Sequence, residues 1–319
     1  MKDIKELKNI AVLGSGVLGG QIAYQSAFKG KQVIVYDISQ EALARCKIVH
    51  DSYGKIYKKD LNATDEDVKA TTNHLTYTTD INLLDKVDFV IEAVSELPEA
   101  KQEAYKKLSL VLPKDAILAT NTSMLLPKDF VDFVPNPKQY CALHFANFIW
   151  KFNFAEVMAH KETSKDTLEK VYKYAIDIGM VPIPVEKENN GYILNSWFFP
   201  LCHSGLTLVT NGVGSPENVD RSFMLFNKPV TMGPLGMVDM VGMNTAYNIL
   251  TYWGNVFKDQ QMLKNAAYIK EHYIDKGKLG VLSGEGFYKY PKPAFEAKDF
   301  INIPNYNSID ELVKRTLLN

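Results

Sequence analysis

The chain has 319 residues, of which 46% are hydrophobic, and its formal net charge is −1. The near-neutral charge gives no support for a nucleic-acid partner, and no apolar run reaches the roughly 18 residues that a membrane span needs. The length favours two domains, since single cores rarely extend over so many residues.

Strands and helices are predicted to alternate through the first half of the chain. Apolar runs that are nearly continuous are typical of strands covered on both faces. The predicted strands are 9–13, 32–36, 87–94, 116–120, 140–145, 154–158 and 180–185. One helix is predicted to start at Pro98, a residue favoured in the first turn. Another is predicted to be capped by Ser164 and to end at Gly179. This alternation predicts an α/β fold with a Rossmann-like, doubly wound and mostly parallel sheet.

The pattern changes after Val185, where the polar stretch 186–191 suggests a boundary. Beyond it helical patterns dominate, and the stretch 193–209 is strongly apolar. A helix of this kind is expected in a core or at a subunit interface. We therefore expect an NAD-binding, Rossmann-like domain over residues 1–187 and a mostly helical C-terminal domain for substrate binding and dimerisation over residues 188–319.

The first predicted strand runs directly into a glycine-rich turn. Gly14, Gly16 and Gly19 form a Gly-x-Gly-x-x-Gly motif, and Val17 and Leu18 begin the following helix. Such a turn lets the backbone approach a pyrophosphate, and the N-terminus of the helix favours the negative charge of that group. The motif therefore predicts a dinucleotide site.

Asp37 closes the next predicted strand, about twenty residues after the glycines, as the dinucleotide fingerprint requires. Its carboxylate would accept hydrogen bonds from the ribose hydroxyls of adenosine and would repel a 2′-phosphate, which favours NAD over NADP. The alternative is a glycine-rich turn without a ligand. The order of strand, glycines, helix and acid favours the dinucleotide.

His144 follows the apolar residues 140–143 near the end of a predicted strand. Ligands bind beyond the carboxyl ends of strands in open α/β sheets, so His144 is placed where a catalytic base is expected. Glu156 lies in the next apolar strand, where an unpaired charge is costly. Two adjacent strands could bring these side chains together, and the carboxylate would then fix the imidazole tautomer. The alternative is a buried structural histidine beside a glutamate that faces solvent.

Short polar residues follow the predicted strand 116–120 and suit hydrogen bonds to a ligand carbonyl or hydroxyl, although turn and capping chemistry explains them equally well. The three cysteines, Cys46, Cys141 and Cys202, form no C-x-x-C pair. They give no indication of a disulfide framework or a metal site, and we expect a cytoplasmic enzyme.

Taken in order along the chain, these motifs resemble the L-3-hydroxyacyl-CoA dehydrogenase family. The motifs are Gly14-x-Gly16-x-x-Gly19, Asp37, residues 90–96, residues 121–123, His144-Phe145-x-Asn147, Glu156-Val157, residues 191–195, residues 232–234 with 239–242, and residues 284–288. The resemblance covers nearly the whole chain. Its last three motifs are specific, since a generic Rossmann enzyme lacks them.

The resemblance implies NAD as cofactor and an L-3-hydroxyacyl-CoA as substrate. His144 would take the proton of the 3-hydroxyl while C3 gives its hydride to NAD, and Glu156 would orient the imidazole. Ser123 and Asn195 would hold the oxygens of the substrate. The remaining implied contacts are Asn121, Asn147, Glu96 and Lys101 for the cofactor, and Ser52 and Lys59, by approximate alignment, for coenzyme A.

The sequence departs from the family after His144. The family has Phe-Asn-Pro followed by further prolines, whereas residues 145–154 here contain several aromatic side chains and no proline. Two alternatives therefore stay open. One is the same chemistry on a small free 3-hydroxy acid or similar polar alcohol, such as a sugar acid or carnitine. The other is a non-catalytic NAD-binding protein. The resemblance also implies a homodimer built on the helical domain. We expect a separate enzyme rather than one part of a larger multifunctional β-oxidation protein.

Overall fold

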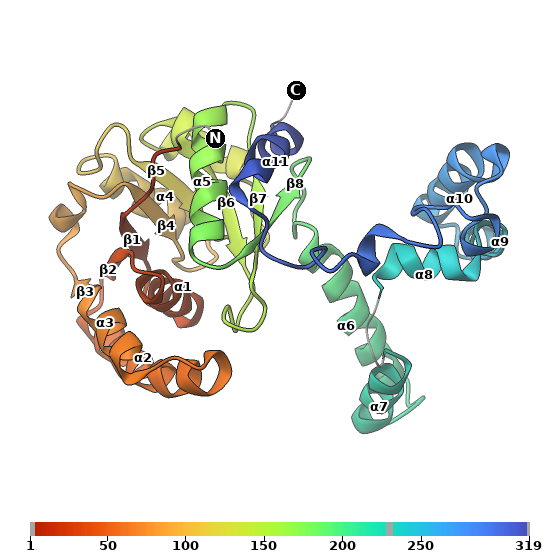
Figure 1. Ribbon diagram of the computed structural model, residues 1–319, viewed down its shortest axis with the longest axis horizontal. Helices are drawn as coiled ribbons and strands as arrows, with labels where there is room; N and C mark the ends of the chain where they lie inside the picture. The colour runs from red at the N-terminus through yellow and green to blue at the C-terminus, as the bar shows by residue number, and fades with distance from the viewer. Residues whose placement is uncertain (1–3, 228–231, 318–319) are drawn as a thin grey trace. The chain divides into compact units, whose positions relative to one another are not determined.

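The computed structural model describes residues 4–227 and 232–317 (Figure 1). The chain forms two compact units. One contains the residues up to Ser204 together with those from Ile303 onward, and the other is Gly205–Asn302.

A single twisted sheet organises the first unit (Figure 1). Its strands are β1 (Asn9–Leu13), β2 (Gln32–Tyr36), β3 (Leu75–Thr78), β4 (Phe89–Glu92), β5 (Ile117–Thr120), β6 (Tyr140–Phe145), β7 (Phe154–Met158) and β8 (Val181–Val185). Their spatial order is β3-β2-β1-β4-β5-β6-β7-β8. Strands β1 to β6 run parallel, β7 runs antiparallel to β6, and β8 is parallel to β7. The predicted Rossmann-like, mostly parallel sheet is confirmed.

Residues of each central strand alternate between two hydrophobic cores. Ile10 and Val12 lie in the core built with the helices α1 and α5, whereas Ala11 and Leu13 lie in the core built with α4. The helices of the first unit are α1 (Val17–Phe28), α2 (Gln40–Leu61), α3 (Asp65–Asn73), α4 (Pro98–Leu108), α5 (Lys165–Asp177) and α11 (Ile309–Thr316). Burial on both faces explains why these strands are continuous apolar runs in the sequence.

The two predicted helix starts are confirmed, whereas α5 ends at Asp177 and not at Gly179, and one strand was missed. Helix α4 begins at Pro98, and the Ser164 hydroxyl accepts a hydrogen bond from the backbone N–H of Thr167, 3.1 Å away, at the start of α5. The sequence patterns did not predict β3. This four-residue strand pairs only with β2 at the edge of the sheet, and none of its residues is fully buried, so it lacks a long apolar run.

The second unit is mostly helical in its described residues, as predicted. Its helices are α7 (Pro216–Phe226), α8 (Pro234–Val241), α9 (Met243–Phe257) and α10 (Gln260–His272), while α6 (Leu194–Thr210) begins in the first unit. Within 4–227 and 232–317, no helix combines the length and apolar character needed to cross a bilayer.

The glycine-rich motif at 284–288 folds around the buried carboxylate of Asp239 in the second unit. This carboxylate accepts hydrogen bonds from the backbone N–H groups of Phe287 and Tyr288, at 2.8 and 2.9 Å, and from the hydroxyl of Tyr290 at 3.0 Å. A Cβ at Gly286 would lie 2.2 Å from the Asp239 Oδ1, so only glycine fits. The glycine at position 286 of the motif thus has a packing cause within this unit.

The segment from Ile303 returns to the sheet. Helix α11 packs on α5 and β8, with Ile309 and Val313 buried in the core, and the hydroxyls of Tyr172 and Thr316 are hydrogen-bonded. The predicted boundary assigned 188–204 and 303–319 to the second domain, whereas both segments belong to the compact unit of the sheet. A helical pattern alone does not say which core a helix covers. As a division between functional domains, the boundary at residue 187 stays a prediction.

Candidate active site

His144 and Glu156 face each other across the antiparallel pair β6–β7. The register places them directly opposite one another, and opposite residues project from the same side of a sheet. The His144 Nδ1 lies 2.8 Å from the Glu156 Oε2. Both residues are almost completely buried, with exposed fractions of 3% and 1%. The structure therefore brings together the two side chains that the sequence singled out.

The Glu156 carboxylate is held on its other side by the start of α6. Its Oε1 accepts hydrogen bonds from the backbone N–H groups of Ile193 and Leu194, each at 2.9 Å. These donors belong to the N-terminus of a helix, which favours negative charge. An ionised carboxylate only accepts hydrogen bonds, so the Nδ1 of His144 must donate, and the Nε2 of the neutral ring is left as an acceptor.

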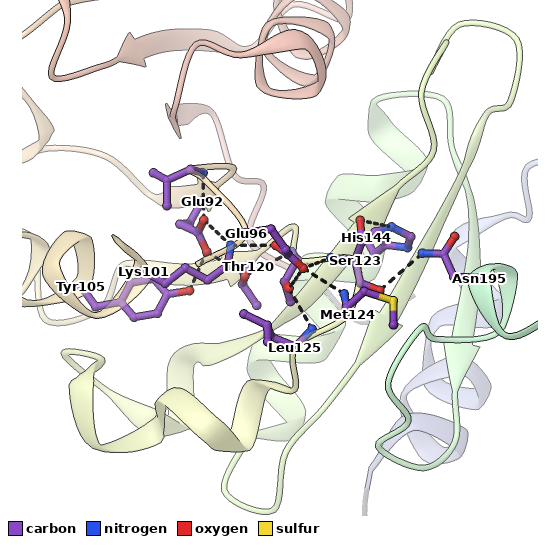
Figure 2. A network of polar contacts seen from close by, with 12 residues as sticks. Glu92, Glu96, Lys101, Tyr105, Thr120, Ser123, Met124, Leu125, His144 and Asn195 are labelled. Carbon is purple, nitrogen blue, oxygen red and sulfur yellow. Dashed lines mark hydrogen bonds and ion pairs between the residues drawn. The ribbon is translucent and has the colours of Figure 1, made fainter. Parts of the chain in front are cut away.

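Ser123 and Tyr192 contact the imidazole, and Asn195 contacts Ser123. The Ser123 Oγ lies 3.2 Å from the His144 Nε2, and the Asn195 side chain donates a hydrogen bond to the carbonyl of Ser123 at 3.4 Å (Figure 2). The ring of Tyr192 stacks on His144, with centroids 4.7 Å apart. The sequence reasoning did not single out Tyr192, and its position within the 191–195 motif was the available signal.

The glycine-rich turn has the form that a pyrophosphate needs. Gly14 has a φ of +95°, and a Cβ there would lie 2.5 Å from the Ala93 carbonyl oxygen. A Cβ at Gly19 would lie 2.1 Å from the Gly14 oxygen, so the helix approaches the turn closely. In contrast, a Cβ at Gly16 would meet no protein atom within 4 Å. The open space at the start of α1 fits a phosphate group.

A cavity of about 630 Å³ adjoins this turn, within the range of about 300–1,000 Å³ that small-molecule sites occupy. Gly14, Gly16, Val17 and Asp37 line it, whereas Leu18 is packed against the core beneath. The Asp37 Oδ2 accepts hydrogen bonds from the backbone and the hydroxyl of residue 15, at 2.8 and 2.7 Å. The acid that closes β2 therefore lies at the glycine turn, as the fingerprint predicts.

The other predicted residues lie outside this cavity. Asn121 is buried and accepts a hydrogen bond from the Phe145 N–H at 3.0 Å, and Asn147 is exposed in the loop after β6. Ser52 and Lys59 are exposed on α2, seven positions apart, and therefore share one face of that helix. Glu96 and Lys101 also do not line the cavity.

The aromatic loop between β6 and β7 is anchored on α1 and α2. The Gln21 side-chain oxygen accepts hydrogen bonds from the backbone N–H groups of Phe148 and Ile149, at 2.7 and 3.3 Å. The Trp150 indole donates to the Asp60 carboxylate at 3.1 Å. These contacts anchor a loop that contains no proline.

Two family models match consecutive parts of the chain. The model for the NAD binding domain of 3-hydroxyacyl-CoA dehydrogenase matches residues 9–189, and the model for the C-terminal domain of the same enzyme matches residues 191–290. The chain belongs to the 3-hydroxyacyl-CoA dehydrogenase family. The resemblance inferred from the motifs is confirmed, and the NAD binding domain of the family indicates NAD as the cofactor.

Similar proteins include both fatty acid oxidation enzymes and a diketoreductase. The α subunit of a fatty acid oxidation complex from Idiomarina loihiensis is 31% identical over 292 residues, which cover 90% of this chain and 39% of that protein. This chain thus spans less than half the length of that relative.

Among solved structures, a diketoreductase described for dual catalysis of dicarbonyl compounds is 39% identical, with a TM-score of 0.67 over 90% of this chain and 100% of its own. The (S)-3-hydroxybutyryl-CoA dehydrogenase PaaH1 from Ralstonia eutropha is 25% identical, with a TM-score of 0.66 over the same shares.

Proposed function

We propose that this protein interconverts an L-3-hydroxyacyl-CoA and the corresponding 3-ketoacyl-CoA, with His144 as the general base. The observation that carries the proposal is the buried His144–Glu156 pair, in which a carboxylate occupies Nδ1 and leaves Nε2 as an acceptor beside Ser123. NAD supplies the acceptor for the hydride that leaves C3 of the alcohol.

His144 would take the hydroxyl proton at Nε2 as the hydride leaves, and Glu156 would stabilise the resulting imidazolium. In the reverse direction His144 returns this proton to the oxygen of the ketone. A positioned general base typically contributes about 10²–10⁴-fold to the rate. Histidine suits this task because its ordinary pKa lies near neutral pH.

Ser123 and Asn195 would orient the substrate. The Ser123 hydroxyl lies within reach of the same Nε2, so it can donate a hydrogen bond to an oxygen that approaches His144. Asn195 contacts the backbone of Ser123 from the start of α6. We also propose that Asn121 and Asn147 contact the cofactor. The exposed face of α2 that carries Ser52 and Lys59 is proposed to bind coenzyme A.

A second candidate is the reduction of a dicarbonyl compound, or the oxidation of a small 3-hydroxy acid or similar polar alcohol, with no coenzyme A on the substrate. The 39% identity to a diketoreductase along its full length favours this candidate. The aromatic loop, with Phe148 and Phe152 each more than half exposed, also separates this chain from the proline-rich family pattern. Both candidates use the same His144 chemistry.

One set of assays tests both candidates. NADH absorbance is followed with acetoacetyl-CoA, with free acetoacetate and with small diketones, for the wild type, His144→Ala and the control His272→Ala. Turnover that needs the CoA thioester supports the first candidate, and turnover of free dicarbonyl compounds alone supports the second. We expect His144→Ala to lower kcat about 10²–10⁴-fold with NAD binding retained. Full turnover by His144→Ala would overturn the assignment of the base.

We further propose a cytoplasmic homodimer. The apolar helix α6 supports the dimer, because Trp197, Phe198 and Leu201 are each more than a third exposed in the single chain. Size-exclusion chromatography with light scattering tests the dimer, and a monomer at micromolar concentration would contradict it. Cell fractionation tests the compartment.

A further inference from the structure

The ring of Tyr192 covers one face of the His144 imidazole. The two rings are stacked, with centroids 4.7 Å apart and an angle of 29° between their planes. Both side chains are buried, with exposed fractions of 3% for His144 and 1% for Tyr192. The imidazole therefore has an aromatic ring, and not bulk water, as its neighbour on this face.

The backbone at Tyr192 is held in an unusual conformation. Its φ is +55°, in the left-handed region that a bulky residue seldom adopts. The Tyr192 N–H donates to the Asn189 carbonyl at 3.0 Å, and the Tyr192 carbonyl accepts hydrogen bonds from the side chains of Asn189, at 3.0 Å, and of Ser196. Strained backbone of this kind persists only where its surroundings hold it, and it is frequent at active sites. These hydrogen bonds thus fix the residue whose ring lies on His144.

Residues 192–194 contact both members of the His144–Glu156 pair. Tyr192 packs on the imidazole, while the N–H groups of Ile193 and Leu194 bind the Glu156 carboxylate. The carboxylate places a negative charge at the Nδ1 of the imidazole. The aromatic ring presents the negative face of its π-system. Both neighbours therefore favour a positive charge on the imidazole.

The hydroxyl of Tyr192 takes no part in this arrangement. It is buried, and it has no hydrogen-bond partner among the residues that the structure describes. Burial raises the pKa of Tyr192 well above its ordinary value, so the hydroxyl stays neutral. The ring, and not the hydroxyl, is therefore the part of Tyr192 that can act on His144.

We propose that Tyr192 is a positioning residue, whose ring stabilises the imidazolium that forms when His144 takes the hydroxyl proton. The inference rests on the proposed function, in which His144 is the general base. A cation within about 6 Å of an aromatic centroid is attracted to the face of the ring, and this attraction is largest where water is excluded. The neutral imidazole lacks this attraction, so the ring favours the protonated state.

Four further titratable groups interact electrostatically with Tyr192, namely Glu156, Glu96, Tyr140 and Cys141. Burial raises the pKa of the Tyr140 hydroxyl well above its ordinary value and that of the Cys141 thiol to about 12. Burial also raises the pKa of Glu96, but the hydrogen bond from Thr122 and the charge of Lys101 outweigh burial and leave the pKa lowered. Near neutral pH these three groups keep one charge state, so a change in the pH profile reports on the His144–Glu156 pair.

The test compares Tyr192→Leu and Tyr192→Phe with Tyr268→Leu as the control. Leucine fills much of the buried volume without an aromatic face, whereas phenylalanine keeps the face without the hydroxyl. Tyr268 is about half exposed in the second unit, where its ring contacts His272 with centroids 4.5 Å apart. NADH absorbance gives kcat/KM against pH, for oxidation of L-3-hydroxybutyryl-CoA, or of the alcohol formed from the best dicarbonyl substrate, and for the reverse reduction.

The neutral imidazole is the active form in the oxidation, so kcat/KM falls as the pH falls. We expect Tyr192→Leu to lower the pH of half-maximal kcat/KM by about 0.4–1.5 units, because the imidazolium is then less favoured. In the reduction the imidazolium is the active form, and the alkaline limb of the profile should also move to lower pH. Tyr192→Phe and Tyr268→Leu should keep both wild-type profiles. A loss of packing alone would lower kcat without moving either limb.

A trifluorinated phenylalanine at position 192 decides the test if Tyr192→Leu does not fold. Its ring has nearly the shape of phenylalanine, but fluorine withdraws electrons and weakens the negative face. The half-maximal pH of this variant should therefore lie below that of Tyr192→Phe.

Two results would overturn the inference. One is a half-maximal pH that does not move in Tyr192→Leu, or in the fluorinated variant relative to Tyr192→Phe. The other is a shift in Tyr192→Phe as large as in Tyr192→Leu, since the hydroxyl would then carry the effect. His144→Ala is assayed in the same series. If His144→Ala keeps full turnover, the proposed function fails, whereas impairment of His144→Ala with an unmoved profile in Tyr192→Leu rejects only the role of Tyr192.

Discussion

Substitution of Glu156 by glutamine would leave the site with one hydrogen-bond acceptor too few. The carboxylate accepts hydrogen bonds on both oxygens, from the Nδ1 of His144 on one side and from the N–H groups of Ile193 and Leu194 on the other. A carboxamide of the same shape has only one accepting oxygen. In Glu156→Gln, either the helix N–H groups or the imidazole must therefore face an NH₂ group.

The structure indicates whether the helix N–H groups or the imidazole of His144 would lose their hydrogen-bond acceptor. A buried polar group left without a partner costs about 1–3 kcal/mol, so turning the amide toward the two N–H groups costs about 2–6 kcal/mol. The oxygen should therefore stay on the helix, and the NH₂ group should face His144. The Nδ1 must then accept, which moves the ring proton to Nε2 and removes the base. The same tautomer error in a catalytic triad costs about 10⁴-fold, so we expect kcat to fall about 10²–10⁴-fold.

The assay is NADH absorbance with saturating acetoacetyl-CoA or the best dicarbonyl substrate, together with NADH binding and a melting curve. Glu162→Gln, at an exposed position after β7, is the control. We expect the melting temperature and NADH affinity of Glu156→Gln to stay close to those of the wild type. Wild-type turnover by a folded Glu156→Gln protein would refute the tautomer argument.

Three further predictions concern the cofactor site, the second unit and acid stability. Asp37→Ala should raise the KM for NAD about 10–10²-fold, since a hydrogen bond to a charged group contributes about 1.5–3 kcal/mol, and should weaken the preference for NAD over NADP in steady-state kinetics. Gly286→Ala should lower the melting temperature, measured by calorimetry, because its Cβ would meet the Asp239 carboxylate at 2.2 Å. Burial raises the pKa of Asp177, but hydrogen bonds from Tyr306 and Lys31, among others, outweigh burial and leave the pKa lowered. Asp177 therefore stabilises the fold above its unfolded pKa of about 3.9, and this effect is lost as the pH falls through the folded pKa. In urea unfolding, Asp177→Asn should be less stable than the wild type at neutral pH. In acid, the stability of the variant should approach that of the wild type.

Each of these predictions has a result that contradicts it. An unchanged ratio of NAD to NADP use in Asp37→Ala would remove Asp37 from cofactor selection. Gly233→Ala is the control for Gly286→Ala, since its Cβ would meet no atom within 4 Å, and equal melting temperatures for the two variants would reject the packing argument. A stability loss in Asp177→Asn that is the same at every pH would exclude titration of that carboxyl as its cause.

Sequence patterns predicted the sheet well because a strand that is buried on both faces is a continuous run of apolar residues. Strands such as β1 and β6 are continuous apolar runs, and a polar residue at the end of such a run, like His144, is easily noticed. Glu156 was found for the same reason, since a charge within a buried strand needs a partner. The short edge strand β3 has no such apolar run, and the sequence patterns did not predict it.

Contacts between distant segments could not be predicted in the same way. Lys101 looks like an ordinary helix lysine in the sequence, and only the fold shows that it is buried between Glu92 and Glu96. The anchoring of the aromatic loop by Gln21 joins residues 127 positions apart. The return of α11 to the sheet depends on packing against α5 and β8, which a helical pattern does not specify.

The return of α11 also has a consequence for biosynthesis. A ribosome releases residues 205–302 before the segment that buries Ile309 and Val313 against the sheet. The sheet unit thus cannot complete its core until α11 has been synthesised, whereas the intervening helical unit is already free to fold. During this interval the apolar surface that α11 later covers on α5 and β8 is open to water, and transiently exposed surface of this kind promotes aggregation of nascent chains.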